Sequence, residues 1–236
     1  MSKVNSKSFL RPDLVVFDLD NTFYDYESAH EMALSALLND SRMSSDIDAA
    51  ETYKTARTNV KNRLGSSASS HSRLLYLAES FALLETEFNT SNLLELEELY
   101  WSTFLREMVA FPSSIEFVDE LLAKEIECAL VTDLTATIQY RKIESLELVN
   151  KFHYVVTSEE AGGDKSTLLP WKLLDERTRL NCYSTIWYIG DSKHDLNPSM
   201  RGPRDVAFLK TNQGPLTTTG DHYLFSSFAD LAKLLE

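Results

Sequence analysis

Hydrophobic and polar positions follow two different patterns along this chain. A short apolar run, Asp13-Leu-Val-Val-Phe-Asp18, contains β-branched residues and predicts a buried parallel strand. From about residue 27 to residue 108 the pattern becomes helical, with Ser- and Asn-rich breaks and no strand pattern. It predicts helices at Glu27–Leu38, Asp46–Leu64, Ser72–Phe88 and Asn92–Met108.

After Phe111-Pro112, predicted helices and short apolar strands alternate. The strands are predicted at Glu127–Thr132, Tyr154–Val156, Thr185–Ile189, Asp205–Leu209 and Tyr223–Phe225, and the helices at Ser113–Lys124, Thr135–Leu146, Thr167–Thr178 and Phe228–Leu235. This alternation predicts an α/β fold, a Rossmann-like and mostly parallel sheet with helices on both faces. Because the helical stretch interrupts the alternation after its first strand, we expect a core of residues 1–24 and 111–236 with an inserted helical domain at 25–110.

The composition excludes several classes of protein. The 236 residues carry 36 acidic against 23 basic side chains, a formal net charge of -13, which argues against polymeric nucleic acid or an anionic membrane as a partner. The two cysteines, Cys128 and Cys182, argue against a disulfide framework or a cysteine zinc site. The polar N-terminus and the lack of a long apolar run predict a cytoplasmic protein that does not enter a membrane.

Polar side chains follow the predicted strands at their carboxyl ends, where open α/β sheets bind ligands. Two carboxylates, Asp18 and Asp20, leave the first strand on the same side, so one can attack while the other handles a proton. Further along lie Thr132-Asp133, Lys165 and the pair in Gly190-Asp-Ser-Lys-His-Asp195. Each is common in turns and helix caps when taken singly. Together they predict one pocket with a nucleophile, an acid, a hydroxyl, a cation and a second carboxylate pair.

This ordered set resembles the haloacid dehalogenase superfamily, whose motifs are Asp-x-Asp-x-Thr, a strand-terminal Thr, a Lys and Gly-Asp-x-x-x-Asp. The inserted helical domain matches the position of the α-helical cap of that superfamily. The resemblance implies that Asp18 is a nucleophile forming an aspartyl-phosphate and that Asp20 protonates the leaving oxygen and later activates water. It implies that Thr132 and Lys165 hold the phosphoryl oxygens, while Asp133, where the family commonly has Asn or Gly, offers its backbone N–H.

The resemblance also implies a Mg²⁺ cofactor, held by Asp18, the backbone carbonyl of Asp20, and Asp191. Asp195 then lies in the outer shell of the metal or orients Lys165. Elementary electrostatics gives the same requirement, because a carboxylate that attacks a phosphate dianion is repelled unless a cation neutralises the site. The predicted function is therefore a Mg²⁺-dependent phosphatase acting on a small phosphorylated metabolite. Asp20 argues against dehalogenation, which needs no protonated leaving group.

Three other functions stay open. A phosphomutase uses the same motifs and keeps the phosphoryl group until the product turns round. A signalling receiver also has a phosphorylatable Asp, acidic metal ligands, a Thr and a Lys, but is about half this length and has no cap. A catalytically silent scaffold would not need all the chemical groups. The natural substrate and the oligomeric state are left open by the sequence.

One stretch of the inserted domain has an unusual charge pattern. Between Glu51 and Glu79 there is no acidic residue, although several basic residues lie there. One hypothesis is that Arg63, His71 and Arg73 face the cleft and select a substrate with a second anionic group, since Arg favours such planar recognition. The alternative is that these side chains line a solvated helix face or pair with acidic neighbours.

Overall fold

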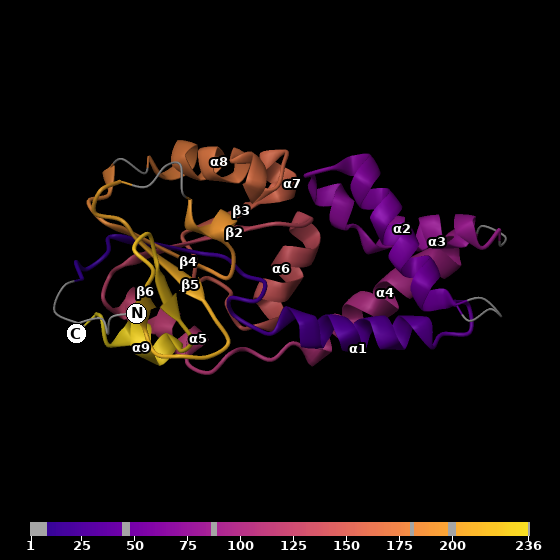
Figure 1. Ribbon diagram of the computed structural model, residues 1–236, viewed down its shortest axis with the longest axis horizontal. Coiled ribbons are helices and arrows are strands. Elements are labelled where there is room, and N and C mark those ends of the chain that lie inside the picture. Colours follow the sequence, from indigo (N-terminus) through magenta and orange to yellow (C-terminus); the bar gives the residue numbers. More distant parts are fainter. Residues whose placement is uncertain (1–8, 44–47, 86–88, 180–181, 198–201, 236) are drawn as a thin grey trace.

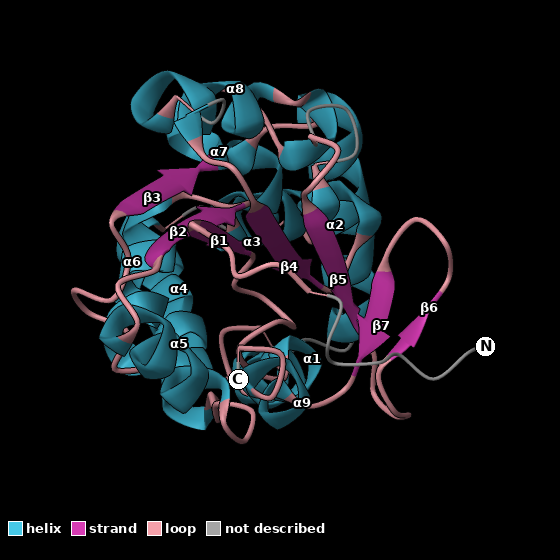
Figure 2. Cartoon of the chain, turned by 90° about the vertical axis from the view of Figure 1, so that its left-hand side faces the viewer, coloured by secondary structure: helices cyan, strands magenta, loops and turns pink. Residues whose placement is uncertain are grey.

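The computed structural model describes residues 9–43, 48–85, 89–179, 182–197 and 202–235. Within them the chain forms a seven-stranded sheet (Figure 1), in the order β3-β2-β1-β4-β5-β7-β6 (Figure 2). The strands are β1 (Leu14–Phe17), β2 (Glu127–Thr132), β3 (Tyr154–Thr157), β4 (Ile186–Gly190), β5 (Val206–Lys210), β6 (Thr217–Thr218) and β7 (Tyr223–Phe225). Neighbouring strands run parallel except β6, which is antiparallel to β7. The predicted Rossmann-like, mostly parallel sheet is confirmed.

Strand β1 lies between β2 and β4, with Phe17 opposite Leu130 on one side and Ile189 on the other. From β1 the following strands β2 and β3 are added on one side, whereas β4 and the strands after it are added on the other side. The topological switch point therefore lies between β1 and β4. Ligands of such sheets bind in the crevice beyond the carboxyl ends of the strands at that point. Residues directly after β1 and β4 are therefore placed to share one site.

Successive side chains of β1 point to opposite faces of the sheet and pack into two separate hydrophobic cores. Val15 and Phe17 belong to one core, and Leu14 and Val16 to the other, which also contains Trp171. Figure 2 shows α8 (Leu169–Thr178) over one face of the sheet, and α5 (Ser114–Ala123) and α9 (Phe228–Ala232) against the other. Four shorter or peripheral elements complete this part: α6 (Ala136–Ser145), α7 (Ser158–Ala161), and the 3₁₀ helices η3 (Lys165–Thr167) and η5 (Lys193–Leu196).

The remaining helices form a block beside the sheet (Figure 1): α1 (Tyr26–Leu38), α2 (Ala49–Leu64), the 3₁₀ helix η2 (Ala68–His71), α3 (Arg73–Leu83) and α4 (Thr90–Glu107). A polar side chain caps the start of each α-helix by accepting backbone N–H bonds, namely Asp25, Asp48, Ser72 and Asn89. None of the described helices is both long and apolar enough to cross a membrane.

The chain enters and leaves this helical block side by side. The backbone N–H of Phe111 donates to the carbonyl of Phe23 at 2.7 Å, and Tyr24 forms an antiparallel bridge with Ala110. The two connections are thus held together beyond the carboxyl end of the central strand β1.

Some element boundaries differ from the sequence prediction. The helix expected at Thr167–Thr178 is divided into η3 and α8 by Leu168, which has a left-handed φ of 65°. Pro170 then lies in the first turn of α8, where its missing N–H costs nothing. Strand β6 was not predicted, since two residues are too short to show a pattern. The predicted helix ends at Asp46 and Phe88 lie outside the described residues.

Candidate active site

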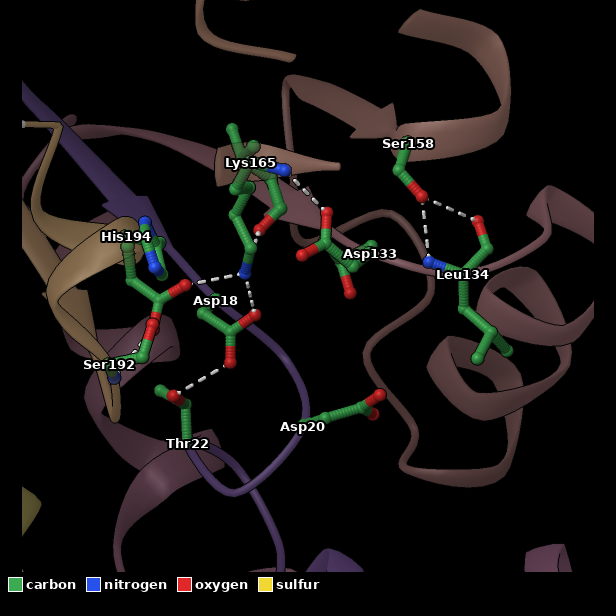
Figure 3. Close-up of polar contacts among 12 residues, drawn as sticks. Asp18, Asp20, Thr22, Asp133, Leu134, Ser158, Lys165, Ser192 and His194 are labelled. Atoms are coloured by element: carbon green, nitrogen blue, oxygen red, sulfur yellow. Dashed lines mark hydrogen bonds and ion pairs between the residues drawn. The ribbon is translucent and has the colours of Figure 1, made fainter. Parts of the chain in front are cut away.

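Asp18 follows β1 directly and is 5% exposed. Its backbone N–H donates to the carbonyl of Ile189 at 2.9 Å, which keeps it in register with β4. Its two carboxylate oxygens have different partners, because Oδ2 accepts from the Thr22 hydroxyl at 3.0 Å and Oδ1 accepts from Lys165 Nζ at 2.5 Å (Figure 3). The side chain is therefore fixed on both sides beyond the end of the central strand.

Lys165 also reaches Asp195, whose Oδ1 lies 2.5 Å from the lysine Nζ. Asp195 is held in turn by the backbone N–H of Ser192, which donates to its Oδ2 at 2.7 Å. A side chain at Gly190 would clash with it, because a Cβ there would lie 2.1 Å from the Asp195 Cβ. The Gly190-Asp-Ser-Lys-His-Asp195 sequence thus folds so that Asp195 reaches back across the end of β4 to Lys165.

The buried charges at this site are unbalanced. Burial raises the pKa of Asp18 well above its ordinary value, although Lys165 opposes the shift. Burial, with the nearby Asp195 charge, raises the pKa of Asp191 to about 6. Burial acts to raise the pKa of Asp195 as well, but Lys165 and Ser192 outweigh it and hold that pKa below its ordinary value. Lys165 pairs with two of these carboxylates, Asp18 and Asp195, and a further cation at the site would favour the ionised form of all three.

The side chains present fit a divalent metal ion. Asp18, Asp191 and Asp195 each offer a carboxylate oxygen, and these oxygens lie within 4.8 Å of one another. Oxygen-only ligands of this kind suit Mg²⁺. The ligand set expected from the sequence used the backbone carbonyl of Asp20 and placed Asp195 in the outer shell. The structure brings Asp195 into the same cluster and also against Lys165, while the individual metal-binding roles stay predictions.

The Thr132-Asp133 segment ends β2 beside the lysine loop. Thr132 is fully buried, and the Gln139 amide donates to its hydroxyl. Asp133 was expected to turn its side chain away, leaving only its N–H toward a ligand. Its carboxylate accepts the backbone N–H of Lys165 at 2.9 Å, and the residue borders the same cavity as Asp18. Asp133 therefore fastens the loop that carries the lysine, which explains an acidic residue at this position.

Asp20 points away from Asp18 in Figure 3 and has its own partners. Lys142 Nζ donates to both of its carboxylate oxygens, at 2.7 and 2.8 Å, and the Tyr24 hydroxyl donates at 2.5 Å. Lys142 is 0% exposed. Its ammonium lies 5.3 to 5.9 Å from the centres of four aromatic rings, those of Tyr24, Tyr26, Trp101 and Phe104.

Lys142 was missed by the sequence reasoning, although a signal was present. It lies four residues after Ile138 and next to Ile143, so a lysine occupies the buried face of α6. Such a position predicts a lysine paired inside the protein. Its partner, 122 residues earlier in the chain, could not be identified from the sequence.

A cavity of about 400 Å³ opens above these groups. Its described lining includes Asp18, Asp20, Asn21, Tyr26, Glu27, Arg57, His71, Asp133, Leu134, Asp164, Lys165, Ser166, Asp191, Ser192, His194 and Asp195. The volume is in the usual range for small-molecule sites. Side chains of both the sheet and the helical block border it, so a bound molecule would contact both.

Of the three basic residues expected to face the cleft, only His71 borders the cavity. Arg63 instead pairs with Glu79 at 2.9 Å on the neighbouring helix and is mostly exposed. Arg73 is buried, donates to the Tyr26 and Tyr100 hydroxyls, and lies 5.1 Å from the centre of the Tyr100 ring. Both positions differ from the expectation, because Arg63 pairs with Glu79 on α3 and Arg73 is buried within the helical block. Arg57, which was not selected, borders the cavity.

Comparison with known sequences agrees with this geometry. The pattern of the family described as haloacid dehalogenase-like hydrolase matches residues 15–202. A ribulose-1,5-bisphosphate 5-phosphatase of Halopiger xanaduensis is 36% identical over 171 residues, which cover 69% of this chain and 72% of that protein.

Several solved structures share the fold. The HAD-hydrolase YfnB of Bacillus subtilis, solved with magnesium bound, has a TM-score of 0.66 and 20% identity over 96% of this chain and 99% of that one. A 2-haloacid dehalogenase of Pseudomonas syringae has a TM-score of 0.66 and 19% identity, with 94% and 97% of the two chains covered. A HAD phosphatase of Thermococcus onnurineus has a TM-score of 0.62 and 17% identity, with the same coverage. At these identities the likenesses describe the fold alone.

Proposed function

This chain belongs to the haloacid dehalogenase-like hydrolase family, and on that premise we propose that it is a Mg²⁺-dependent phosphatase acting through a phosphorylated Asp18. The observation that carries the proposal is the pair of differently held carboxylates at the switch point of the sheet. Asp18 lies among Lys165, Asp191 and Asp195, while Asp20 is held apart by Lys142. The substrate is a small phosphorylated metabolite, which the size of the cavity and the phosphatase relative both support.

The proposal assigns a step to each side chain. An Asp18 oxygen attacks the phosphorus, and the bond between phosphorus and the ester oxygen breaks as Asp20 gives that oxygen a proton. Water then attacks the phosphorylated Asp18 while Asp20 takes a proton back, which releases phosphate and restores both carboxyl groups. Lys165 faces the nucleophile throughout and offsets the negative charge of the transferring group. Mg²⁺ held by Asp18, Asp191 and neighbouring oxygens would supply further charge neutralisation.

The proposal also covers the organisation of the chain. Residues 1–24 and 111–236 would form the catalytic core, and 25–110 would form a cap domain. The hydrogen bond between Phe23 and Phe111 supports this division, because the chain leaves the core and returns to it at the same place. A cytoplasmic location is favoured by the two cysteines, Cys128 and Cys182, both free in the structure.

Phosphate release from a panel of sugar phosphates, nucleotides and phosphorylated hydroxy acids tests the function. We expect turnover with Mg²⁺ and loss of most of it after chelation.

Because the pKa of Asp191 is raised to about 6, its carboxylate takes up a proton below that pH. The Mg²⁺ concentration for half-maximal activity should therefore rise as the pH falls below about 6. No release from any ester would refute the phosphatase, and transfer to an isomeric sugar without release would favour a phosphomutase.

The ion pair of Lys142 with Asp20 gives a second expected result. In Lys142→Met the Asp20 carboxylate loses the charge that holds it, so proton transfer to the leaving oxygen becomes poorly aligned. We expect kcat to fall about 10- to 100-fold, with KM changed by less than about threefold. Steady-state kinetics on one aryl phosphate measures both constants.

Arg141→Met is the matched control, because Arg141 is the preceding residue on α6 but pairs with Glu98 at the surface. We expect its kcat within about twofold of the wild type. A Lys142→Met enzyme with normal kcat, or with KM raised as much as kcat is lowered, would contradict the positioning of Asp20 by this lysine.

A further inference from the structure

Arg57 differs from Lys165 and His71, two other basic side chains around the cavity. Lys165 is paired with Asp18 and Asp195, and His71 Nε2 lies 3.2 Å from Asp164 Oδ2. Among the described residues, no carboxylate lies within ion-pair distance of Arg57. It is exposed at the cavity wall, on the side formed by the helical block.

The surroundings of Arg57 concentrate positive charge. Lys61 lies one helical turn later on α2, the spacing at which like charges face each other and destabilise a helix. Burial lowers the pKa of Lys61, and Arg57 and Arg73 lower it further. The buried Arg73 donates to hydroxyls and a carbonyl, and no described carboxylate pairs with it. Lys61 and Arg73 thus add positive charge near Arg57, which is the one of the three that borders the cavity, and an anion bound at Arg57 would relieve the repulsion.

The helical block is fastened to the catalytic side next to this charge. Besides the contact between His71 and Asp164, the backbone N–H of Asp164 donates to the carbonyl of Ser66 at 3.2 Å. Asp164 immediately precedes Lys165, the partner of Asp18. These two contacts hold the helical block, which carries Arg57, against the loop that carries Lys165. Arg57 and the nucleophile Asp18 border the same cavity.

We infer that Arg57, with Lys61 one helical turn away, forms a subsite for a second anionic group of the substrate, in the cavity that Asp18 also borders. The inference rests on the proposed function and names its substrate class: a phosphate monoester that carries a second phosphate or carboxylate on the same carbon chain. The planar guanidinium suits either anion, because it can donate two parallel hydrogen bonds. The half-buried Lys61 adds charge at longer range.

Three five-carbon compounds test the subsite: pentane-1,5-diol bisphosphate, the corresponding monophosphate, and 5-phosphonooxypentanoate. We expect kcat/KM to be about 10- to 100-fold higher for at least one doubly anionic compound than for the monophosphate. Preference for the bisphosphate alone identifies phosphate as the second anion, and preference for the carboxylate compound identifies carboxylate. Arg57→Ala should lower the preference about tenfold or more, and Arg57→Lys should retain part of it.

Arg63→Ala is the matched control, since Arg63 lies on the same helix but pairs with Glu79 away from the cavity. Its preference should stay within about twofold of the wild type. Equal kcat/KM for all three compounds, or an unchanged preference in Arg57→Ala, would overturn the subsite.

Binding separates this inference from the proposed function. Calorimetric titration of Asp18→Asn with the same compounds needs no turnover. Tighter binding of a doubly anionic compound, lost in Asp18→Asn/Arg57→Ala, would support the subsite even if the wild type released no phosphate. Equal affinities of Asp18→Asn for all three compounds would refute the subsite even in an active phosphatase.

Discussion

Asp18→Asn is expected to lower the rate of phosphate release by at least about 10⁴-fold. The amide that replaces the carboxylate is a poor nucleophile, and it also removes one of the oxygens that fit a metal. The measurement is kcat for an aryl phosphate at saturating Mg²⁺. Acid quenching of the wild type during turnover should in addition trap one phosphoryl group on the peptide that contains Asp18.

Loss of activity in this variant should not come from unfolding. Burial raises the pKa of Asp18, and the charges of Asp195 and Asp191 raise it further, so the ionised carboxylate is costly in the folded protein. An uncharged amide of the same size should leave the midpoint of thermal unfolding without Mg²⁺ at pH 7 equal or higher, since Lys165 keeps Asp195 as a partner. Retained activity with a normal midpoint would show that Asp18 is not the nucleophile.

Lys165→Met has the largest effect we expect on stability. Removing the lysine leaves Asp18 and Asp195 buried beside each other without their shared cation. Breaking such a buried pair costs about 3–5 kcal/mol of unfolding free energy. Chemical denaturation in the absence of metal measures the loss, and activity should be lost with it.

The charge origin of this loss can be separated from a packing defect. Without the lysine, the two acids have raised pKa values, and a raised pKa favours the folded state at low pH and disfavours it as the pH rises. The deficit should therefore shrink between about pH 7 and about pH 5, and also on addition of Mg²⁺. Lys172→Met, at an exposed position of α8, should stay within about 0.5 kcal/mol of the wild type. A Lys165→Met deficit independent of pH and metal would point to packing.

The sequence predicted the sheet well because its strands are short apolar runs that end in polar residues. Strand β1 is buried on both faces, and that burial requires the unbroken apolar pattern of Leu14–Phe17. The division of the helix after Lys165 escaped prediction, because a single left-handed residue, Leu168, leaves no mark in hydrophobic periodicity. Helix starts were predicted closely where a capping side chain such as Ser72 stands before them.

The site was predicted where its residues lie at strand ends and missed where they lie on helix faces. Asp18 follows β1, Lys165 and Asp195 lie in the short 3₁₀ helices η3 and η5, and the motif order placed them together. Lys142 and Arg57 reach the site from the sides of helices, so their partners depend on how those helices pack. The same packing turned Arg63 toward Glu79 instead of the cavity.

The sequence by itself determined the family, the parallel sheet and the group of carboxylates around one lysine, because these depend on local pattern and on the edge that all parallel strands share. Only the tertiary structure decided which oxygen each charge contacts. It placed Lys142 against Asp20, Asp133 against the lysine loop, and Arg57 on the cavity wall. An ion pair forms only when two charges lie within a few ångströms of each other. For residues far apart in the chain, that distance in space is set by how the helices and strands pack.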